Sequence, residues 1–371
     1  MKITFPHMGN VCIVVKALFD SLGIEFITPP VNSKKTLEIG TKYAPELACL
    51  PLKINIGNFI ESIKLGADTI VNAGGCGPCR FGYYGQVQRE ILKDLGLNVD
   101  FIVLDKPDEN LEDFLEKIRK LSGGNSYLKI LSAIKDATKV SIKLDRLERI
   151  SFYTRPREIK KGETDNILKN FYGRVHKTHG AKELLKLIYE TEKKLKNIEI
   201  DKNLKPLKIA IVGEIYVVIE PFTNLRIEQM LGNMGIEVLR SVTLSEWICD
   251  HMLKKALRIP QRFEYVKEAK PYLNSMIGGH AQETVGHCVM YAKQGYDGII
   301  QIYPFSCMPE IVAESLMPAI SRDFNIPIMT LVIDEMTGEA GYATRIEAFV
   351  DMLNRRRERT MTGHEYVLSG N

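Results

Sequence analysis

The stretch between Thr69 and Leu95 constrains the fold more than any other part of the sequence. Residues 69–71 form an apolar, β-branched run typical of a buried strand, and residues 87–95 have the spacing of a helix. Between them stands the glycine-rich turn GGCGPC (residues 74–79), with two thiols three positions apart. In an open α/β sheet, ligands bind at the carboxyl ends of the strands. The stretch therefore predicts a parallel sheet whose ligand-binding edge carries a CxxC pair.

The same alternation of strand, turn and helix occurs on both sides of a helical middle. Strands are expected at residues 2–5, 24–28, 69–71, 99–104, 207–213, 237–239, 297–303 and 328–333. Helices are expected at residues 11–22, 36–41, 52–64, 87–95, 111–121, 127–150, 167–195, 224–234, 245–257, 283–294, 311–324 and 343–353.

This pattern predicts an α/β protein built from two Rossmann-like units, each a doubly wound and mostly parallel sheet. The first unit covers residues 1–105, and a helical connector follows at 106–205. The second unit covers residues 206–371. A length of 371 residues suits this division, because chains of this size usually form more than one domain.

Composition argues against several classes of partner. The net charge is only +4 and both signs are mixed along the chain, which gives no reason to expect binding to nucleic acid or to an anionic membrane. No apolar run reaches the roughly 18 residues that a membrane helix needs, and the start MKITFPHMGN does not resemble a signal peptide. We therefore expect a cytoplasmic protein.

The cysteines leave metal binding, redox chemistry or plain burial open, and Cys49 and Cys307 each have inert burial as an alternative. Their number is seven, and an odd number in a chain without a signal peptide argues against a disulfide framework. Cys307 follows a buried strand and precedes a helix, like Cys76 and Cys79, and Cys49 lies in a loop before another helix. The amino end of a helix favours the thiolate form that metals bind. Four thiolates suit tetrahedral zinc or an iron–sulfur cluster, but the spacing lacks the two close pairs of a zinc ribbon.

The remaining cysteines fall in helical apolar patterns. Cys12 and Cys249 are expected to be inert buried thiols. Cys288 has the same expected character, although it stands next to His287.

Other candidates are weaker, and each has an ordinary structural explanation beside the functional one. His280, preceded by two glycines, and His287 either line a site or are satisfied structural histidines. Glu214 follows the first strand of the second unit, at the same sheet edge. Neither a P-loop nor a GxGxxG motif occurs, so binding of ATP or a dinucleotide by this chain is not expected.

An acidic cluster follows the last expected strand. Asp334, Glu335 and Glu339 stand there in the sequence DEMTGEAG, at the expected ligand-binding edge. They either handle protons and bind a partner, or they cap a helix and solvate a loop.

Several segments together resemble the 2-hydroxyacyl-CoA dehydratase superfamily, and more closely its branch of activase-associated and double-cubane iron–sulfur proteins. These segments are FPHMGN, PELACLPLK, AGGCGPCRFGYYGQVQRE, GEIYVVIEPFTN, YPFSCMPEIVAESLMP and IDEMTGEAGYATRIEAFVDML. They cover most of both expected α/β units and little of the helical middle.

The resemblance implies two Rossmann-like units that hold an oxygen-sensitive iron–sulfur cluster in the cleft between them. It implies reduction by a separate ATP-hydrolysing activator protein, and assembly as a homodimer or a heterodimer. The motif thiols are Cys49, Cys76, Cys79 and Cys307. A single 4Fe–4S cluster is the first expectation, and a double cubane (8Fe–9S), completed by Cys288 and Cys249, is the second.

Three functions remain open at this stage. The first is a low-potential electron-transfer protein, acting as a reductase or dehydratase-type component. The second is a non-catalytic accessory or regulatory member of a 2-hydroxyacyl-CoA dehydratase system. The third is a small-molecule-binding α/β protein with incidental thiols. No feature of the sequence identifies a CoA-binding site or the substrate.

Overall fold

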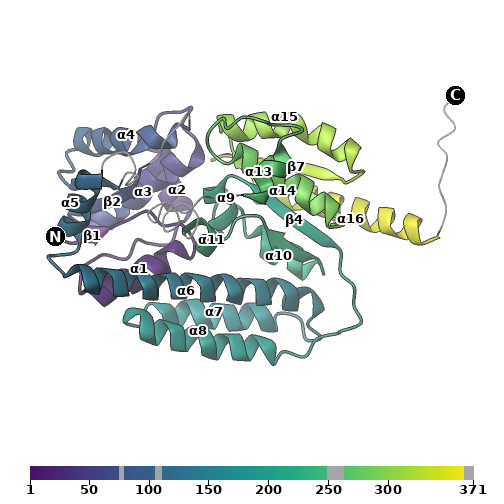
Figure 1. Cartoon of the computed structure of the whole chain (residues 1–371), viewed down its shortest axis with the longest axis horizontal. Coiled ribbons are helices and arrows are strands. Elements are labelled where there is room, and N and C mark those ends of the chain that lie inside the picture. The colour runs from purple at the N-terminus through teal and green to yellow at the C-terminus, as the bar shows by residue number, and fades with distance from the viewer. Residues whose placement is uncertain (75–78, 105–110, 249–262, 363–371) are drawn as a thin grey trace.

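The chain is a mixed α/β protein with two parallel sheets and a helical layer (Figure 1). The computed structural model describes residues 1–74, 79–104, 111–248 and 263–362. Within these ranges no helix has the length and apolarity needed to cross a membrane.

The first sheet lies in the N-terminal part of the chain and has helices on both faces. Its parallel strands are β1 (Ile3–Thr4), β2 (Thr69–Ala73) and β3 (Asp100–Leu104), in that order. The helices are α1 (Val11–Leu22), α2 (Lys34–Tyr43), α3 (Leu50–Lys64), α4 (Phe81–Asp94) and α5 (Leu111–Leu121). Apolar residues of α1 pack on one face of the sheet, and those of α3 and α4 pack on the other.

The helical middle forms a separate layer along the lower edge of the molecule in Figure 1. It consists of α6 (Tyr127–Thr154), the 3-10 turn η1 (Arg155–Arg157), α7 (Glu163–Val175) and α8 (Gly180–Lys196). Its core also contains Ile13, Val14 and Ala17 of α1, so the first helix joins the N-terminal sheet to this layer.

The second sheet has four parallel strands in the order β5-β4-β6-β7. They are β4 (Lys208–Gly213), β5 (Glu237–Arg240), β6 (Gly298–Pro304) and β7 (Ile328–Ile333). The helices are α9 (Ile215–Ile219), α10 (Ile227–Asn233), α11 (Leu244–Ile248), α13 (Glu264–Ala269), α14 (Ala281–Lys293), α15 (Met308–Asp323) and α16 (Glu339–Thr362). Helices α14 and α15 pack on one face, and α9, α10 and α16 pack on the other.

Helix α3 connects the two sheets. Its residues from Leu50 to Ile60 are all buried, as expected for a helix with protein on every side. Leu52 and Ile56 belong to the N-terminal core, whereas Leu50 and Ile54 pack among the strands of the second sheet. The two halves of the chain therefore share one helix as core.

The contact between α2 and α3 depends on two glycines. A Cβ on Gly57 would lie 1.9 Å from the carbonyl oxygen of Thr36, and one on Gly40 would lie 1.8 Å from that of Lys53. The two backbones touch, so these positions require glycine.

The sequence predicted the kind of most elements correctly, with several differences. No element was expected at α9 or α13, and residues 249–257 of the helix expected at 245–257 lie outside the described part of the chain. Residues 24–28 form only an isolated bridge at Phe26, because its partner β1 has just two residues. The helix expected at 167–195 is divided into α7 and α8, and Gly180, with φ of 70°, begins the second. Helix α4 begins six residues earlier than expected. Helix α16 continues past residue 353 to Thr362, and no glycine or proline occurs between residues 354 and 362.

Candidate metal centre

Three of the four motif thiols stand at the amino ends of helices. Cys49 is the N-cap of α3, Cys307 is the N-cap of α15, and Cys79 lies two residues before α4. Prolines in the first turns of α3 and α15 suit these starts. Helix amino ends carry a partial positive charge, so each thiol lies where an anion is stabilised.

Arg80 ties the three thiol-bearing turns together. Its guanidinium donates to the carbonyl oxygen of Leu47 at 3.2 Å, and to the carbonyl and hydroxyl oxygens of Ser306 at 2.6 and 2.9 Å. The Ser306 hydroxyl also donates to the Leu47 carbonyl, at 3.1 Å. Leu47 and Ser306 precede Cys49 and Cys307, and Arg80 follows Cys79. The contacts thus join turns that are far apart in sequence.

The three thiols are partly buried and free of disulfides. Burial raises the pKa of Cys49 to about 11, and it also raises the pKa values of Cys79 and Cys307. Backbone N–H groups at the start of each following helix oppose this shift, as does Arg80 for Cys49 and Cys79. Without a bound metal these thiols are protonated at neutral pH, so they are poor nucleophiles.

Glu214 lies within electrostatic range of all three thiols. It caps α9 by accepting hydrogen bonds from the N–H groups of Tyr216 and Val217, each at 3.1 Å. Burial raises its pKa to about 7. Gly213 makes this position possible: its φ is 135°, and a Cβ there would lie 1.8 Å from the carbonyl oxygen of Ile302.

Glu310 is a second buried acid, in the first turn of α15. It accepts hydrogen bonds from the Thr284 hydroxyl at 2.9 Å and from the Gln301 amide at 3.0 Å. Burial raises its pKa to about 7. No pattern in the sequence marks this residue as buried, because a glutamate in a first helical turn is ordinarily exposed.

Cys49, Cys79 and Cys307 supply thiols, the ligand type that an iron–sulfur cluster takes. Cys76, the fourth motif thiol, lies outside the described residues. Among the residues that are described, no three His, Cys, Asp or Glu side chains lie close enough together to hold a single metal ion. A cubane spaces its ligands more widely than one ion does, and free thiols at helix amino ends are the ligands it needs.

The other cysteines lie elsewhere or outside the described part. Cys288 is completely buried in the core between α14 and α15, where its thiol contacts the sulfur of Met317 at 3.5 Å. Cys12 is buried in the first turn of α1. Cys249 is outside the described residues. Cys288 therefore does not stand at the turns that carry the other thiols.

The two candidate histidines occupy different surroundings. His280 is the N-cap of α14, and a Cβ on the preceding Gly279 would lie 2.7 Å from the side chain of Pro309, beside Cys307. His287 stacks on Tyr291, with ring centroids 5.7 Å apart, and burial lowers its pKa to about 4. His287 thus has the surroundings of a structural histidine.

The three acids that follow β7, Asp334, Glu335 and Glu339, have two different roles. The carboxylate of Asp334 accepts hydrogen bonds at 2.9 Å from the N–H of Met336 and from the hydroxyl of Thr337, which shapes the loop. Glu335 forms an ion pair with Lys53 of α3, whose side chain is almost fully buried. Glu339 pairs with Lys34 at 3.2 Å. Two of the three acids therefore join the halves of the chain.

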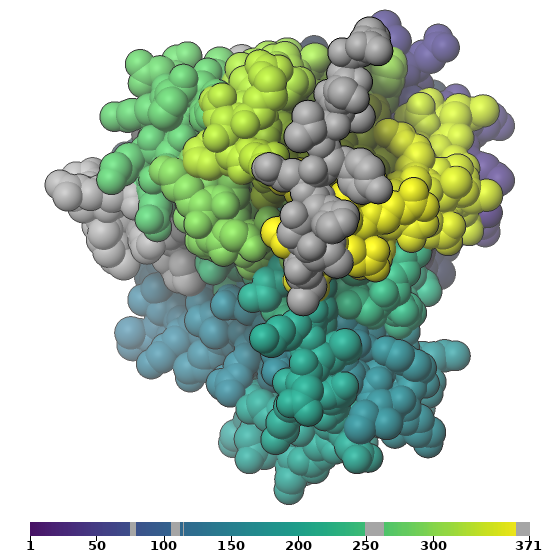
Figure 2. All heavy atoms as spheres, turned by 90° about the vertical axis from the view of Figure 1, so that its right-hand side faces the viewer, coloured from purple at the N-terminus to yellow at the C-terminus, as the bar shows by residue number. Residues whose placement is uncertain are grey.

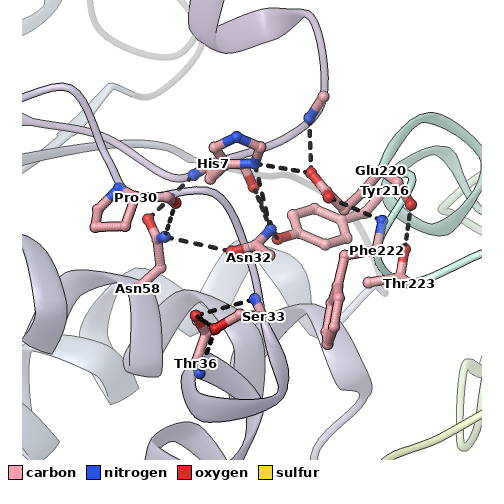
Figure 3. A network of polar contacts seen from close by, with 11 residues as sticks. His7, Pro30, Asn32, Ser33, Thr36, Asn58, Tyr216, Glu220, Phe222 and Thr223 are labelled. Atoms are coloured by element: carbon pink, nitrogen blue, oxygen red, sulfur yellow. Dashed lines mark hydrogen bonds and ion pairs between the residues drawn. The ribbon is translucent and has the colours of Figure 1, made fainter. Parts of the chain in front are cut away.

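A buried polar network near β1 also joins the halves (Figure 3). His7 Nδ1 lies 2.9 Å from a carboxylate oxygen of Glu220, which also accepts the N–H of Gly9 at 2.7 Å. The Tyr216 hydroxyl donates to the carbonyl oxygen of His7 at 2.9 Å. Asn32 completes the link by donating to Tyr216. His7 lies in the motif FPHMGN, and Tyr216 and Glu220 lie in GEIYVVIEPFTN. The contact between these two motifs was not predicted from the sequence.

Comparison with known proteins does not assign this chain to a family. Neither protein-family models nor curated proteins match this chain.

Proposed function

We propose that this chain holds an iron–sulfur cluster on Cys49, Cys76, Cys79 and Cys307 and transfers electrons at low potential. In this proposal it is the reductase or dehydratase-type component of a system in which a separate ATP-hydrolysing activator supplies the electrons. We also infer that the two parallel sheets are Rossmann-like units whose carboxyl edges face the cluster.

One observation carries the proposal. Three free thiols from remote parts of the sequence stand at three helix amino ends, and a single arginine ties their turns together. Positive helix ends stabilise an anionic, thiolate-bound group. A disulfide does not explain why three thiols that form no disulfide stand at these turns. The thiol of Cys49 lies 2.9 Å from the hydroxyl of Tyr84.

In this proposal, the thiols and Arg80 have separate roles in holding the cluster. When bound, the cluster supplies one-electron transfer. The four thiols hold it after losing their protons, which makes assembly depend on pH. Arg80 fixes the spacing of the turns that carry Cys49 and Cys307. Burial limits the access of water.

The thiol count supports one cubane rather than two. A double cubane requires further thiolates, and Cys288 lies in an apolar core against Met317. We therefore propose a single 4Fe–4S cluster.

The experiment is anaerobic purification followed by iron and sulfide analysis and electron paramagnetic resonance. We expect about four irons per chain and a signal that appears on reduction. Cys79→Ala and Cys307→Ala should each lower the iron content, whereas Cys12→Ala, a buried thiol away from the turns, should leave it unchanged. An iron-free chain, or one zinc per chain, would overturn the proposal. A cluster that no activator and ATP can reduce would instead identify an accessory protein.

A further inference from the structure

Cys12, His7 and Glu220 form a group of reactive side chains that the cluster proposal does not use. The sequence predicts a buried thiol at Cys12, and the structure confirms the burial, since this residue is only 7% exposed. The thiol is also in hydrogen-bonding contact with the side chain of His7. His7 Nδ1 in turn lies 2.9 Å from a carboxylate oxygen of Glu220. We refer to these three residues as the Cys12 site.

The three side chains stand in the order thiol, imidazole, carboxylate. In enzymes this order activates a cysteine, because the carboxylate orients the ring and the ring exchanges a proton with the sulfur. Glu220 contacts Nδ1, so Nε2 is the ring nitrogen that is left for this exchange. Asn32 contacts Nδ1, and the Tyr216 hydroxyl contacts the backbone carbonyl of His7, so neither of them uses Nε2 (Figure 3).

The surroundings of His7 keep its ring positively charged. Burial alone would lower the pKa of His7, but Cys12 and Glu220 together raise it to about 10. Tyr216 is a further titratable neighbour, and burial raises the pKa of its hydroxyl, so this group is neutral. Glu220 is itself almost fully buried, and it is fixed by a hydrogen bond from the N–H of Phe222 at 3.1 Å. An imidazolium beside a thiol stabilises the thiolate form.

The position of Cys12 in α1 acts in the same direction. Cys12 is the second residue of this 12-residue helix, and no acid stands in the first turn. The N–H groups of a first turn have no partner within the helix and carry a partial positive charge. The helix end and the imidazolium therefore both favour a negative sulfur at this position.

Other buried thiols of the chain have different neighbours. Cys288 contacts the sulfur of Met317, and Cys49 contacts the hydroxyl of Tyr84 at 2.9 Å. Burial raises the pKa of both thiols, that of Cys49 to about 11. A thioether and a phenol do not take a proton from a thiol at neutral pH. Cys288 and Cys49 are therefore suitable controls for Cys12.

We propose that Cys12 is a thiolate paired with protonated His7 and that hydrogen peroxide oxidises it. Cys12 and His7 are 7% and 9% exposed, which favours a reagent about as small as water. The sulfur attacks one peroxide oxygen, and the bond between the two oxygens breaks. The second oxygen leaves as hydroxide and takes the proton of the His7 imidazolium. The products are the sulfenic acid of Cys12, neutral His7 and water.

Oxidation would act on a contact between the two halves of the chain. Figure 2 shows the face formed mainly by the second half, with the N-terminal segment (purple) visible only at its margin. His7 belongs to the first half and Glu220 to the second, so loss of the imidazolium leaves a buried carboxylate without its cation. Glu220 ends α9, and Glu214 at the start of that helix lies within electrostatic range of the cluster thiols. We therefore expect oxidation of Cys12 to destabilise the contact beside the candidate cluster site.

The test treats the full, metal-free chain with hydrogen peroxide and dimedone, which traps sulfenic acids, and follows each thiol by peptide mass spectrometry. We expect Cys12 to be labelled at least about tenfold faster at neutral pH than Cys49 or Cys288. Exposure alone predicts the opposite order for Cys49, which is only partly buried. His7→Gln should slow the labelling of Cys12 at least about tenfold, because it removes the imidazolium.

A second measurement does not depend on how well the His7 variant folds. Thiolates absorb in the far ultraviolet more strongly than thiols, so the spectrum of the wild type minus that of Cys12→Ser isolates Cys12. We expect a thiolate difference at neutral pH that disappears on acidification. Peroxide should also lower the thermal midpoint of the wild type more than that of Cys12→Ser, because only the wild type loses the charge of His7.

Several outcomes would overturn the proposal. Labelling of Cys12 no faster than that of Cys288, or equally fast in a folded His7→Gln variant, would show that the imidazolium does not activate this thiol. The lack of a thiolate difference spectrum at neutral pH would identify Cys12 as an inert buried thiol. An equal fall of the thermal midpoint in Cys12→Ser would assign the loss of stability to other oxidised groups.

Discussion

Replacement of Gly57 by alanine should separate α2 from α3 and destabilise the whole chain. The added Cβ would lie 1.9 Å from the carbonyl oxygen of Thr36 and 3.1 Å from the backbone nitrogen of Gly40. Real Cβ atoms almost never come within 3.0 Å of such atoms, so the backbones must separate by about 1 Å. The Thr36 carbonyl and the Gly40 nitrogen are both backbone groups, so neither can rotate away as a side chain would.

The magnitude follows from the cost of overpacking. An extra methyl group in a close-packed site costs about 1–3 kcal/mol, and two rigid backbones place Gly57→Ala at the upper end, about 3 kcal/mol. Gly173 in α7 is a matched control, because a Cβ there meets nothing within 4 Å. Alanine should stabilise that helix by about 0.5–1 kcal/mol.

The assay is urea unfolding of the metal-free chain followed by circular dichroism. The two variants share the helix-propensity gain of Gly→Ala, so the difference between them, about 3 kcal/mol in the free energy of unfolding, reports the helix contact alone. If Gly57→Ala is as stable as the wild type, or as stable as Gly173→Ala, the inferred backbone contact is wrong.

Three further predictions concern charged and thiol groups. Burial alone would lower the pKa of His7, but its neighbours Cys12 and Glu220 raise this pKa from 6.5 to about 10. The stability that protonated His7 contributes is therefore complete below pH 6.5 and declines as the pH rises toward 10. His7→Gln should flatten that decline in urea unfolding; equal slopes would contradict the assignment. Because burial raises the pKa of Cys49 to about 11, its alkylation by iodoacetamide at pH 8 in the metal-free chain should be much slower than that of a small-molecule thiol, as peptide mass spectrometry can measure. Glu335→Gln leaves the buried ammonium of Lys53 unpaired and should lower the thermal midpoint more than Lys53→Met, which removes the charge; the reverse order would refute the ion pair.

Local pattern in the sequence was enough to predict the kind of most elements. The β-branched run at Thr69 and the apolar spacing from Val11 to Leu22 correspond to β2 and α1. No element was expected at α9, where isoleucines and valines form a short helix capped by Glu214. There the N-terminal cap and the packing outweigh the preference of these residues for strands.

The turn positions of Cys49, Cys79 and Cys307 were predictable from the strands and prolines around them. The residues that contact these turns were not predictable. Nothing in the sequence near Arg80 indicates that it contacts Leu47 and Ser306, because that contact depends on how two distant halves of the chain are placed. Local sequence predicts which elements form, whereas contacts between elements depend on tertiary packing.

Helix α3 also determines the order in which the chain can complete its fold. Leu50 and Ile54 leave the ribosome long before the strands they pack against, β4 and β6, have been synthesised. Until then this helix exposes an apolar face that only the second half of the chain can cover. We therefore expect an isolated N-terminal fragment to aggregate, and the turns of Cys49, Cys79 and Cys307 to be brought together only when synthesis is nearly finished.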